Sequence, residues 1–450
     1  MTHQPNSIEG RDIAYHLHSY TNARKQEAEG SIVIDRGEGI YVYDNSGKRY
    51  IEGMAGLWSV GVGFGEKRLV EAAARQMEKL PFYHTFTQKT HTPAAELAEK
   101  LVAIAPVPMS KAYFTNSGSE ANDTMVKMIR YRANALGKPE KKKIISRIKG
   151  YHGVTLAAAS LTGLPNNHRS FDLPMPGILH TSCPHYRVYK EENESEAEFV
   201  TRMAADLEAM IEAEGADTIA AFIGEPVMGA GGVIVPPDGY WEAIQAILKK
   251  HDILLVADEV ICGFGRTGNM FGSETMGMEP DIMTLSKQLS SSYQPISALL
   301  INDRVYQPLA DESKSIGTFG HGYTAAGHPV ASAVALENLK IIEERDLVGN
   351  VRALAPRFAE GLGTFAGHPL VVETRGIGLI GAIELKPREG MAPGALGARL
   401  FAILQENGLI ARAIGDSLAL CPPMIIDDRQ LDDMFGIFDK SLDQFAKELG

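Results

Sequence analysis

The strongest constraint on the fold of this 450-residue chain is a set of short apolar runs, each followed by polar residues. Residues 219–223, 253–257 and 282–285 are such runs, and Glu225, Asp258 and Lys287 come at or just after their ends. Unbroken apolar runs are typical of strands that are covered on both faces of a sheet. A helical pattern at 240–250 separates two of the runs, which favours parallel pairing through right-handed crossovers. The sequence therefore predicts an α/β fold with a mostly parallel central sheet.

The two ends of the chain show a different pattern. Residues 30–52 contain alternating segments and turns such as Asn45-Ser46-Gly47, which predict a small antiparallel meander. A long helical pattern at 330–345 leads into further helical and extended segments. Because a chain of this length usually forms more than one core, we expect a large domain at 66–329. A smaller α+β domain would be built from residues 1–65 and 330–450.

Several polar groups are expected at one edge of the predicted sheet. In open α/β sheets, ligands bind beyond the carboxyl ends of the strands. The residues that follow the predicted strands are Ser117, Gly118, Ser119, Tyr151, His152, Glu225, Asp258 and Lys287. Polar side chains that converge in this way indicate a binding site.

Three of these elements have both a chemical and a structural interpretation. The turn at 115–119 offers free N–H groups and hydroxyls to a phosphate, although a plain serine N-cap would also explain it. Asp258 ends a very apolar strand and needs a partner, which a cationic ring nitrogen, an arginine or a helix end would supply. Lys287 at a buried strand end can become a nucleophile towards a carbonyl, although most lysines are solvated. Together the three elements match the phosphate, ring nitrogen and aldehyde of pyridoxal phosphate.

Composition excludes several classes of protein. The chain has 44 basic and 56 acidic residues and a net charge of −12, which argues against a dedicated nucleic-acid binder. Its three cysteines are far apart, as in proteins of reducing compartments. The N-terminus shows no signal-peptide pattern, and no window approaches the roughly 20 apolar residues of a membrane span. We therefore expect a cytoplasmic enzyme that does not act on membranes.

Longer motifs resemble a known family, the class III aminotransferases among the fold-type I pyridoxal-phosphate enzymes. The resemblance covers nearly the whole chain and is carried by TNSGSEAND (115–123), GYHG (150–153), GEPVMGAGG (224–232), ADEVICGFGRTG (257–268), TLSKQLSSSYQPISA (284–298) and GHGYTAAGHP (320–329). Residues 53–65 and 412–423 look like the ω-transaminases, which pair amines or ω-amino acids with pyruvate. The resemblance implies pyridoxal 5'-phosphate as cofactor and ping-pong transamination.

The resemblance also implies a role for each matching residue. Lys287 would bond to the cofactor aldehyde and carry the proton during the reaction, and Asp258 would bind the pyridine nitrogen. Tyr151 and Val260 would enclose the cofactor ring. The other implied cofactor contacts are Ser117, Gly118 and Ser119 at the phosphate, His152 and Glu225 near Asp258, and Thr324 at the phosphate of the neighbouring subunit. The last of these contacts implies a homodimer with shared active sites.

The same resemblance suggests a substrate pocket. Arg412 matches an arginine that pairs with the carboxylate of a keto acid, for which a guanidinium has the right bidentate geometry. The positions that match the pocket wall are Leu57, Trp58, Phe86, Tyr151 and Ala230, with Tyr20 beside them, although aromatic residues are most often simply core. We therefore expect a hydrophobic or aryl-bearing amine as donor, with taurine or β-alanine as alternative native donors.

Other functions fit the sequence less well. Residues 376–381 match the G-x-G-x-x-G pattern of dinucleotide-binding proteins, but the following residues indicate a strand where that motif requires a helix. His84 and His91, or Cys183 and His185, lack the spacing of a zinc site, so we expect no metal. An aminomutase or decarboxylase on the same fold would keep the same cofactor contacts. The presence of Lys287, Asp258 and the phosphate turn together argues against a non-catalytic protein on this fold.

Overall fold

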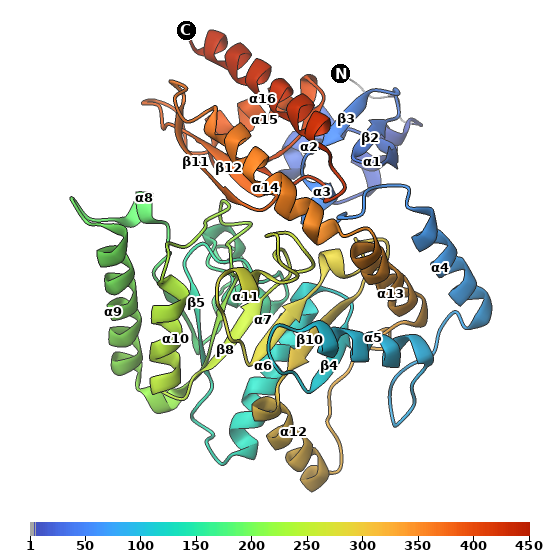
Figure 1. Ribbon diagram of the computed structural model, residues 1–450, viewed down its shortest axis with the longest axis vertical. Helices are drawn as coiled ribbons and strands as arrows, with labels where there is room; N and C mark the ends of the chain where they lie inside the picture. The colour runs from blue at the N-terminus through green and yellow to red at the C-terminus, as the bar shows by residue number, and fades with distance from the viewer. Residues whose placement is uncertain (1–3, 5) are drawn as a thin grey trace.

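A seven-stranded sheet forms the centre of the computed structural model, which describes residues 4 and 6–450 (Figure 1). The strand order is β4-β10-β9-β8-β7-β5-β6. The strands are β4 (Lys111–Thr115), β5 (Lys143–Arg147), β6 (Ile178–Thr181), β7 (Ile219–Gly224), β8 (Leu254–Asp258), β9 (Ile282–Leu285) and β10 (Ser297–Ile301). Pairs β9-β8, β8-β7, β7-β5 and β5-β6 are parallel, which confirms the predicted mostly parallel sheet.

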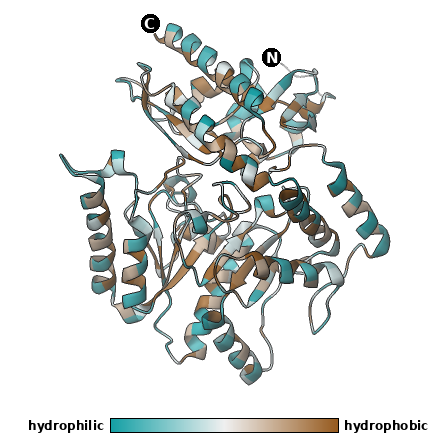
Figure 2. Cartoon of the chain, viewed as in Figure 1, coloured by the Kyte–Doolittle hydropathy of each residue, from teal (hydrophilic) through white to brown (hydrophobic). Residues whose placement is uncertain are grey.

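Both faces of the central sheet are covered, as its unbroken apolar strands predict. In β8, Leu255 and Ala257 belong to the core that includes helix α10 (Tyr240–Lys250), whereas Leu254 and Val256 belong to a second core. The second core includes Met125 of helix α6 (Gly118–Ala135). Successive residues of a strand point to opposite faces, so each face needs its own apolar set. Figure 2 shows these hydrophobic strands at the centre of the molecule and more hydrophilic residues on the outer helices.

One strand of the sheet runs against the parallel pattern. Strand β10 pairs antiparallel with both β9 and β4. The link from β9 to β10 spans only residues 286–296 and holds one short 3-10 helix, Lys287–Leu289. A parallel neighbour needs a crossover of a dozen or more residues, so this short link returns the chain in the opposite direction.

Helices surround the sheets and connect their strands. Helices α9 (Glu196–Glu214) and α10 pack against each other (Figure 1). Helix α13 (Pro329–Glu344) packs against α4 (Lys67–Lys79), α5 (Thr92–Ile104) and α14 (Leu347–Gly363). The other helices between residues 66 and 329 are α7 (Leu156–Leu161), α8 (Tyr186–Tyr189), α11 (Gly272–Thr275) and α12 (Asp303–Ile316). Helix α6 begins at Gly118, directly after the turn that carries Ser117.

The N-terminal part of the chain forms the predicted meander and pairs with a strand from the far end of the chain. Strands β1 (Ile34–Glu38), β2 (Tyr41–Asp44) and β3 (Arg49–Glu52) are antiparallel, and β13 (Leu409–Ile410) adds parallel to β3. Helices α1 (Ile8–Tyr15), α2 (Ala23–Glu29) and α3 (Ala55–Trp58) complete this part. Residues 1–3 and 5, at the start of the predicted 1–65 segment, lie outside the described residues.

The C-terminal part has a second antiparallel sheet with the order β11-β12-β15-β14. Its elements are α14 (Leu347–Gly363), β11 (Val371–Ile377), β12 (Ile380–Leu385), α15 (Ala395–Glu406), β14 (Arg412–Ile414), β15 (Ser417–Leu420) and α16 (Asp428–Leu449). The G-x-G-x-x-G sequence forms the β11–β12 hairpin, with Gly378 in the turn at φ +57°. A strand follows it, as the sequence predicts, so the motif lacks the helix that a dinucleotide fingerprint requires.

No helix in the described part of the chain is long and apolar enough to cross a bilayer.

Candidate active site

The sequence-predicted polar residues gather at the carboxyl ends of the central strands. Asp258 is the last residue of β8, Glu225 follows β7 directly, and Lys287 comes two residues after β9. The turn that holds Ser117 follows β4, and Tyr151 comes four residues after β5. Parallel strands bring their carboxyl ends to one edge, so elements from five strands meet there.

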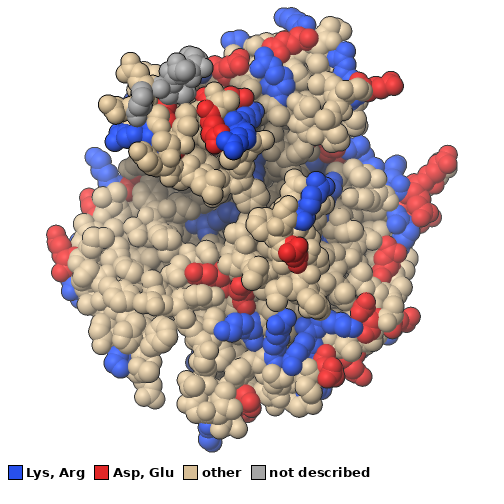
Figure 3. All heavy atoms as spheres, turned by 180° about the vertical axis from the view of Figure 1, so that it is seen from behind, with Lys and Arg blue, Asp and Glu red and all other residues tan. Residues whose placement is uncertain are grey.

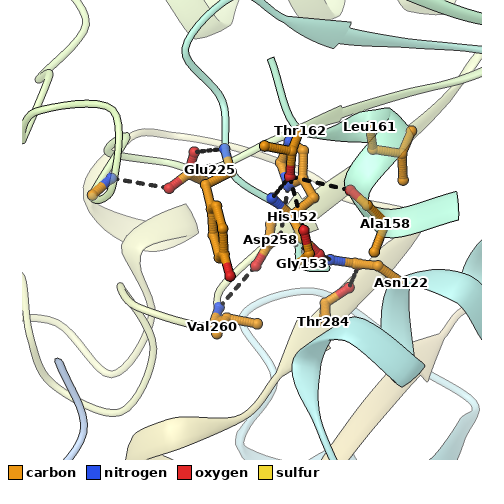
Figure 4. Close-up of polar contacts among 12 residues, drawn as sticks. Asn122, His152, Gly153, Ala158, Leu161, Thr162, Glu225, Asp258, Val260 and Thr284 are labelled. Carbon is orange, nitrogen blue, oxygen red and sulfur yellow. Dashed lines mark hydrogen bonds and ion pairs between the residues drawn. The ribbon is translucent and has the colours of Figure 1, made fainter. Parts of the chain in front are cut away.

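A buried carboxylate is at the centre of this edge (Figure 4). Asp258 is only 3% exposed, and its Oδ2 lies 2.7 Å from His152 Nδ1 and accepts a hydrogen bond of 3.0 Å from Asn122 Nδ2. Its Oδ1 accepts a bond of 3.1 Å from Val260 N. Thr284 holds the Asn122 amide oxygen at 2.8 Å and so fixes the amide's orientation. These donors fix both carboxylate oxygens, as a buried anion requires.

A second buried carboxylate supports the neighbouring loop. Glu225 Oε1 accepts from Tyr151 N at 3.0 Å, and its Oε2 accepts from Gly229 N at 2.9 Å. Burial raises the pKa of Glu225, and the charge of Asp258 acts in the same direction. Glu225 therefore joins the Tyr151 turn to the 229–232 loop that carries Ala230.

Lys287 has the properties of an amine that can lose its proton. It begins the 3-10 helix after β9 in a left-handed backbone conformation, with φ +49°. Among the described residues its Nζ makes no hydrogen bond and no ion pair. Burial lowers the pKa of Lys287 to about 8, although the charges of Asp258 and Glu225 oppose this shift. An uncharged amine at this position is a nucleophile and a base.

The turn before α6 is compatible with both interpretations of the sequence, a serine N-cap and a phosphate site. Ser117 is the N-cap of α6, and its Oγ accepts from Glu120 N at 3.2 Å. Ser119 Oγ accepts from Val154 N at 3.1 Å, which ties the turn to the Tyr151 loop. A Cβ at Gly118 would lie 3.1 Å from a methyl of Val260, so glycine permits this close approach. The helix N-terminus beside Val260 remains suited to an anion.

A pocket of about 470 Å³ opens next to Lys287. Its wall contains the predicted residues Tyr20, Leu57, Trp58, Tyr151, Ala230, Lys287 and Arg412. Arg412 begins β14 and forms no ion pair or hydrogen bond within the described chain, and burial lowers the pKa of its guanidinium. Figure 3 shows the surface hollowed between the upper and lower parts of the molecule, with basic side chains inside the hollow.

Two predicted residues lie away from this pocket. Phe86 lines a different cavity, of about 570 Å³, together with Tyr323 and Ala326. Phe86 is 41% exposed and packs against Gly322, where a Cβ would approach its ring to 2.8 Å. Thr324 in the same loop is also exposed. Within one chain, therefore, neither residue belongs to the wall of the Lys287 pocket.

Sequence reasoning missed several residues that build the site. Asn122 is fully buried in α6 and contacts both Asp258 and the His152 carbonyl oxygen, the latter at 2.7 Å. Asn122 lies inside the 115–123 motif, but the sequence shows neither its burial nor its contact with Asp258. The other pocket residues that were not predicted are Ser19, Met54, Gly56, Ile261, Phe401, Ile410, Ala411 and Ala413.

Comparisons with known proteins identify the family of the chain. The model of the class III aminotransferases matches residues 22–442. The mitochondrial γ-aminobutyrate transaminase 1 of Solanum lycopersicum is 49% identical over 424 residues, which are 93% of this chain and 82% of that protein. The ω-transaminase of Pseudomonas jessenii in complex with PMP superposes with a TM-score of 0.97 at 57% identity over 98% of this chain and 99% of that one. A transaminase solved with L-alanine is 65% identical, with a TM-score of 0.92, over 93% of this chain and all of that one.

The chain belongs to the class III aminotransferases. It is an aminotransferase with the fold of the fold-type I enzymes, and pyridoxal phosphate is the cofactor of this family. The residues present suit that cofactor. Lys287 offers an unpaired amine at the pocket, the fixed carboxylate of Asp258 suits a cationic ring nitrogen, and the Ser117–Ser119 turn suits a phosphate.

The lowered pKa of Lys287 predicts how its reactivity depends on pH. Only the unprotonated amine attacks a carbonyl, so covalent capture of pyridoxal phosphate by cofactor-free protein is expected to accelerate as the pH rises. The midpoint is expected at about 8, with a plateau above it. Stopped-flow absorbance over pH 6–11 measures this, with Lys287→Ala as the control for capture by surface lysines. A midpoint near the ordinary lysine value, about 10.4, would contradict the pKa shift.

Proposed function

We propose that this aminotransferase moves the amino group of a hydrophobic, aryl-bearing primary amine to pyruvate. The observation that carries the proposal is the composition of one pocket: a reactive lysine, an unpaired arginine, and an apolar wall of Leu57, Trp58 and Ala230. A keto acid needs a cation for its carboxylate, whereas an aryl amine needs an apolar wall. This pocket offers both.

The chain's own residues account for the proton transfers. Pyridoxal phosphate, when bound, supplies an aldehyde carbon and an electron-withdrawing ring. The freed Lys287 amine would take the proton from the donor's amine-bearing carbon and return it at the cofactor carbon, so that one group acts as base and then as acid. Asp258, fixed by His152 and Asn122, would hold a proton at the pyridine nitrogen. Tyr151 and Val260 would enclose the ring.

Arg412 supports pyruvate as the acceptor. Its side chain is partly buried at the pocket and has no carboxylate partner in the described chain. A bidentate guanidinium–carboxylate pair would satisfy it and would place the keto group towards Lys287. L-Alanine is the product of pyruvate amination, and a transaminase similar to this chain was solved with L-alanine.

The apolar wall favours an amine over an ω-amino acid as the donor. An ω-amino acid brings a carboxylate that also needs a cation, and Arg412 is the single arginine of the described pocket wall. A variant of a 57% identical ω-transaminase was engineered for asymmetric synthesis of bulky amines. The plant relatives are named γ-aminobutyrate transaminases, so ω-amino acids such as γ-aminobutyrate, β-alanine or taurine are the second candidate donors.

The proposed function is tested by the two half-reactions of the holoenzyme. Addition of 1-phenylethylamine is expected to remove the visible absorbance of the bound cofactor, and pyruvate is expected to restore it. β-Alanine, taurine and γ-aminobutyrate serve as comparison donors in the same spectrophotometric titration. Bleaching by these acids but not by the aryl amine would keep the aminotransferase and overturn the proposed donor.

The role of Arg412 gives a second prediction. Arg412→Ala removes the carboxylate partner, so KM for pyruvate is expected to rise about 10- to 100-fold while KM for 1-phenylethylamine changes less than about threefold. Steady-state kinetics with each substrate varied measures the split. Arg388→Ala, at an exposed arginine that bonds the Leu449 carbonyl oxygen, is the matched control. An equal change in KM for pyruvate and for 1-phenylethylamine would contradict the role of Arg412 as the carboxylate partner.

We also propose that two copies of the chain share their active sites. Phe86 and Thr324 match family site positions, yet both are exposed in one chain and lie outside the wall of its Lys287 pocket. Phe86 packs against Gly322, so the aromatic ring and the loop that holds Thr324 form one surface. In a homodimer, that surface would complete the partner's site, with Thr324 at the cofactor phosphate and Phe86 at the substrate.

The shared-site proposal predicts both a mass and a cofactor effect. Light scattering is expected to give a mass twice that of the 48.8 kDa chain. Thr324→Ala is expected to weaken cofactor retention about tenfold through the loss of one hydrogen bond to a charged group. Thr318→Ala, in the cavity that Phe86 lines, is expected to leave retention unchanged. Equilibrium dialysis of the cofactor measures both variants. A monomer, or equal retention by all proteins, would contradict the proposal.

The cytoplasmic location and the large domain at 66–329 stay predictions. The plant relatives are named for mitochondria or chloroplasts. The pairing of β3 with β13, from opposite ends of the chain, supports a small domain made from both ends.

A further inference from the structure

The short segment that forms part of the pocket wall has an unfavourable backbone conformation. Ala55, Gly56 and Trp58 have φ values of +47°, +70° and +64°. Only glycine adopts this region without penalty, so the two other residues each add strain. Leu57 between them has non-helical angles as well. A conformation like this persists only where surrounding contacts hold it.

This strained segment determines the shape of the pocket. Met54, Gly56, Leu57 and Trp58 all line the pocket beside Lys287. Trp58 is 1% exposed and packs in an apolar cluster with Val227, Ile261 and others. A change in the backbone of residues 54–58 would therefore move the wall that the proposed aryl group contacts.

A buried carboxyl group holds the segment from behind. Glu52 is the last residue of β3 and is 3% exposed. Its Oε2 accepts a hydrogen bond from Gly56 N. Its own main chain is fixed, since Glu52 N donates to the Ile40 carbonyl oxygen at 2.9 Å. The carboxyl group thus connects a rigid strand to the middle of the strained turn.

No ion pair compensates the burial of Glu52 within the described residues. Burial raises its pKa to about 7, and hydrogen bonds from the Gly56 and Met54 N–H groups oppose this shift. An apolar residue would avoid the cost of burying a carboxyl group here. The proton transfers of the mechanism do not use Glu52. A need of the 54–58 turn for this acceptor oxygen would explain why a carboxyl group is buried at residue 52.

We propose that Glu52 is a positioning residue for amine specificity: its carboxyl oxygen binds Gly56 N–H and so holds residues 54–58 in the strained conformation that presents Leu57 and Trp58 to the donor. The inference rests on the proposed function for the identity of the donor. The part that concerns the backbone is independent of which amine is used. What the turn requires is an acceptor at this position, which the amide of glutamine also provides.

Two variants of equal length separate the acceptor from the volume of the side chain. Glu52→Gln keeps an acceptor oxygen, whereas Glu52→Met fills similar space without one. In the holoenzyme, Glu52→Met is expected to raise KM for 1-phenylethylamine about tenfold, as for one lost buried hydrogen bond. Its KM for pyruvate is expected to change less than about threefold, because Arg412 holds that substrate. Glu52→Gln is expected to stay within about twofold of wild type for both.

Tryptophan fluorescence gives a readout that does not depend on activity. The chain has two tryptophans, so Trp241→Phe leaves Trp58 as the sole reporter. In that background, acrylamide quenching of the holoenzyme is expected to increase with Glu52→Met and to remain unchanged with Glu52→Gln. Tyr50→Phe is the matched control, since it removes the 2.8 Å bond to Asp44 from the same strand without touching the turn. If Glu52→Met does not fold, Glu52→Ala replaces it.

The outcomes distinguish a failure of the proposed role of Glu52 from a failure of the proposed amine donor. Wild-type enzyme that ignores 1-phenylethylamine would overturn the proposed donor, and the quenching result would still decide the role of Glu52. Wild-type behaviour of both Glu52→Met and Glu52→Gln would overturn the inference. Variants that are equally impaired would also overturn it, because an acceptor oxygen would then not suffice.

Discussion

The site is organised around one buried carboxylate at the end of the central strand. Asp258 is almost fully buried, and His152, Asn122 and the Val260 N–H group fix its two oxygens. These partners come from the turn after β5, from helix α6 and from the turn after β8. A buried anion is expensive unless it is hydrogen-bonded, so this single constraint fixes three elements relative to one another. Burial raises the pKa of Glu225 and lowers that of Lys287; the charge of Asp258 adds to the first shift and opposes the second.

Strained backbone occurs at two places in the wall of the Lys287 pocket. Lys287, which starts the 3-10 helix after β9, and the Ala55–Trp58 turn both have left-handed φ values at residues other than glycine. Such conformations persist where packing and hydrogen bonds over-determine them. Here the central sheet and the β3–β13 pair act as supports. Rigid strands thereby hold an amine, an arginine and an apolar wall around one pocket.

Much of this arrangement could be predicted from the sequence. The apolar runs before Glu225, Asp258 and Lys287 predicted strands whose carboxyl ends meet, and the structure confirms those strands. The mostly parallel sheet follows from the same runs, because continuous apolar strands require cover on both faces. The antiparallel β10 was not predicted, since its apolar run looks like the others. Only the short link before it determines its direction.

What the sequence determined by itself was the family, the cofactor chemistry and the positions of the central strands along the chain, because these depend on local runs and motifs. What only the tertiary structure decided was which distant residues meet. Asn122 reaches Asp258 across 136 positions, and Glu52 controls a turn that no motif marks as strained. Phe86, which matched a pocket position in sequence, lies in another cavity of its own chain. Motifs record residue types along the chain, whereas burial, hydrogen-bond partners and shared surfaces arise only when the chain is folded.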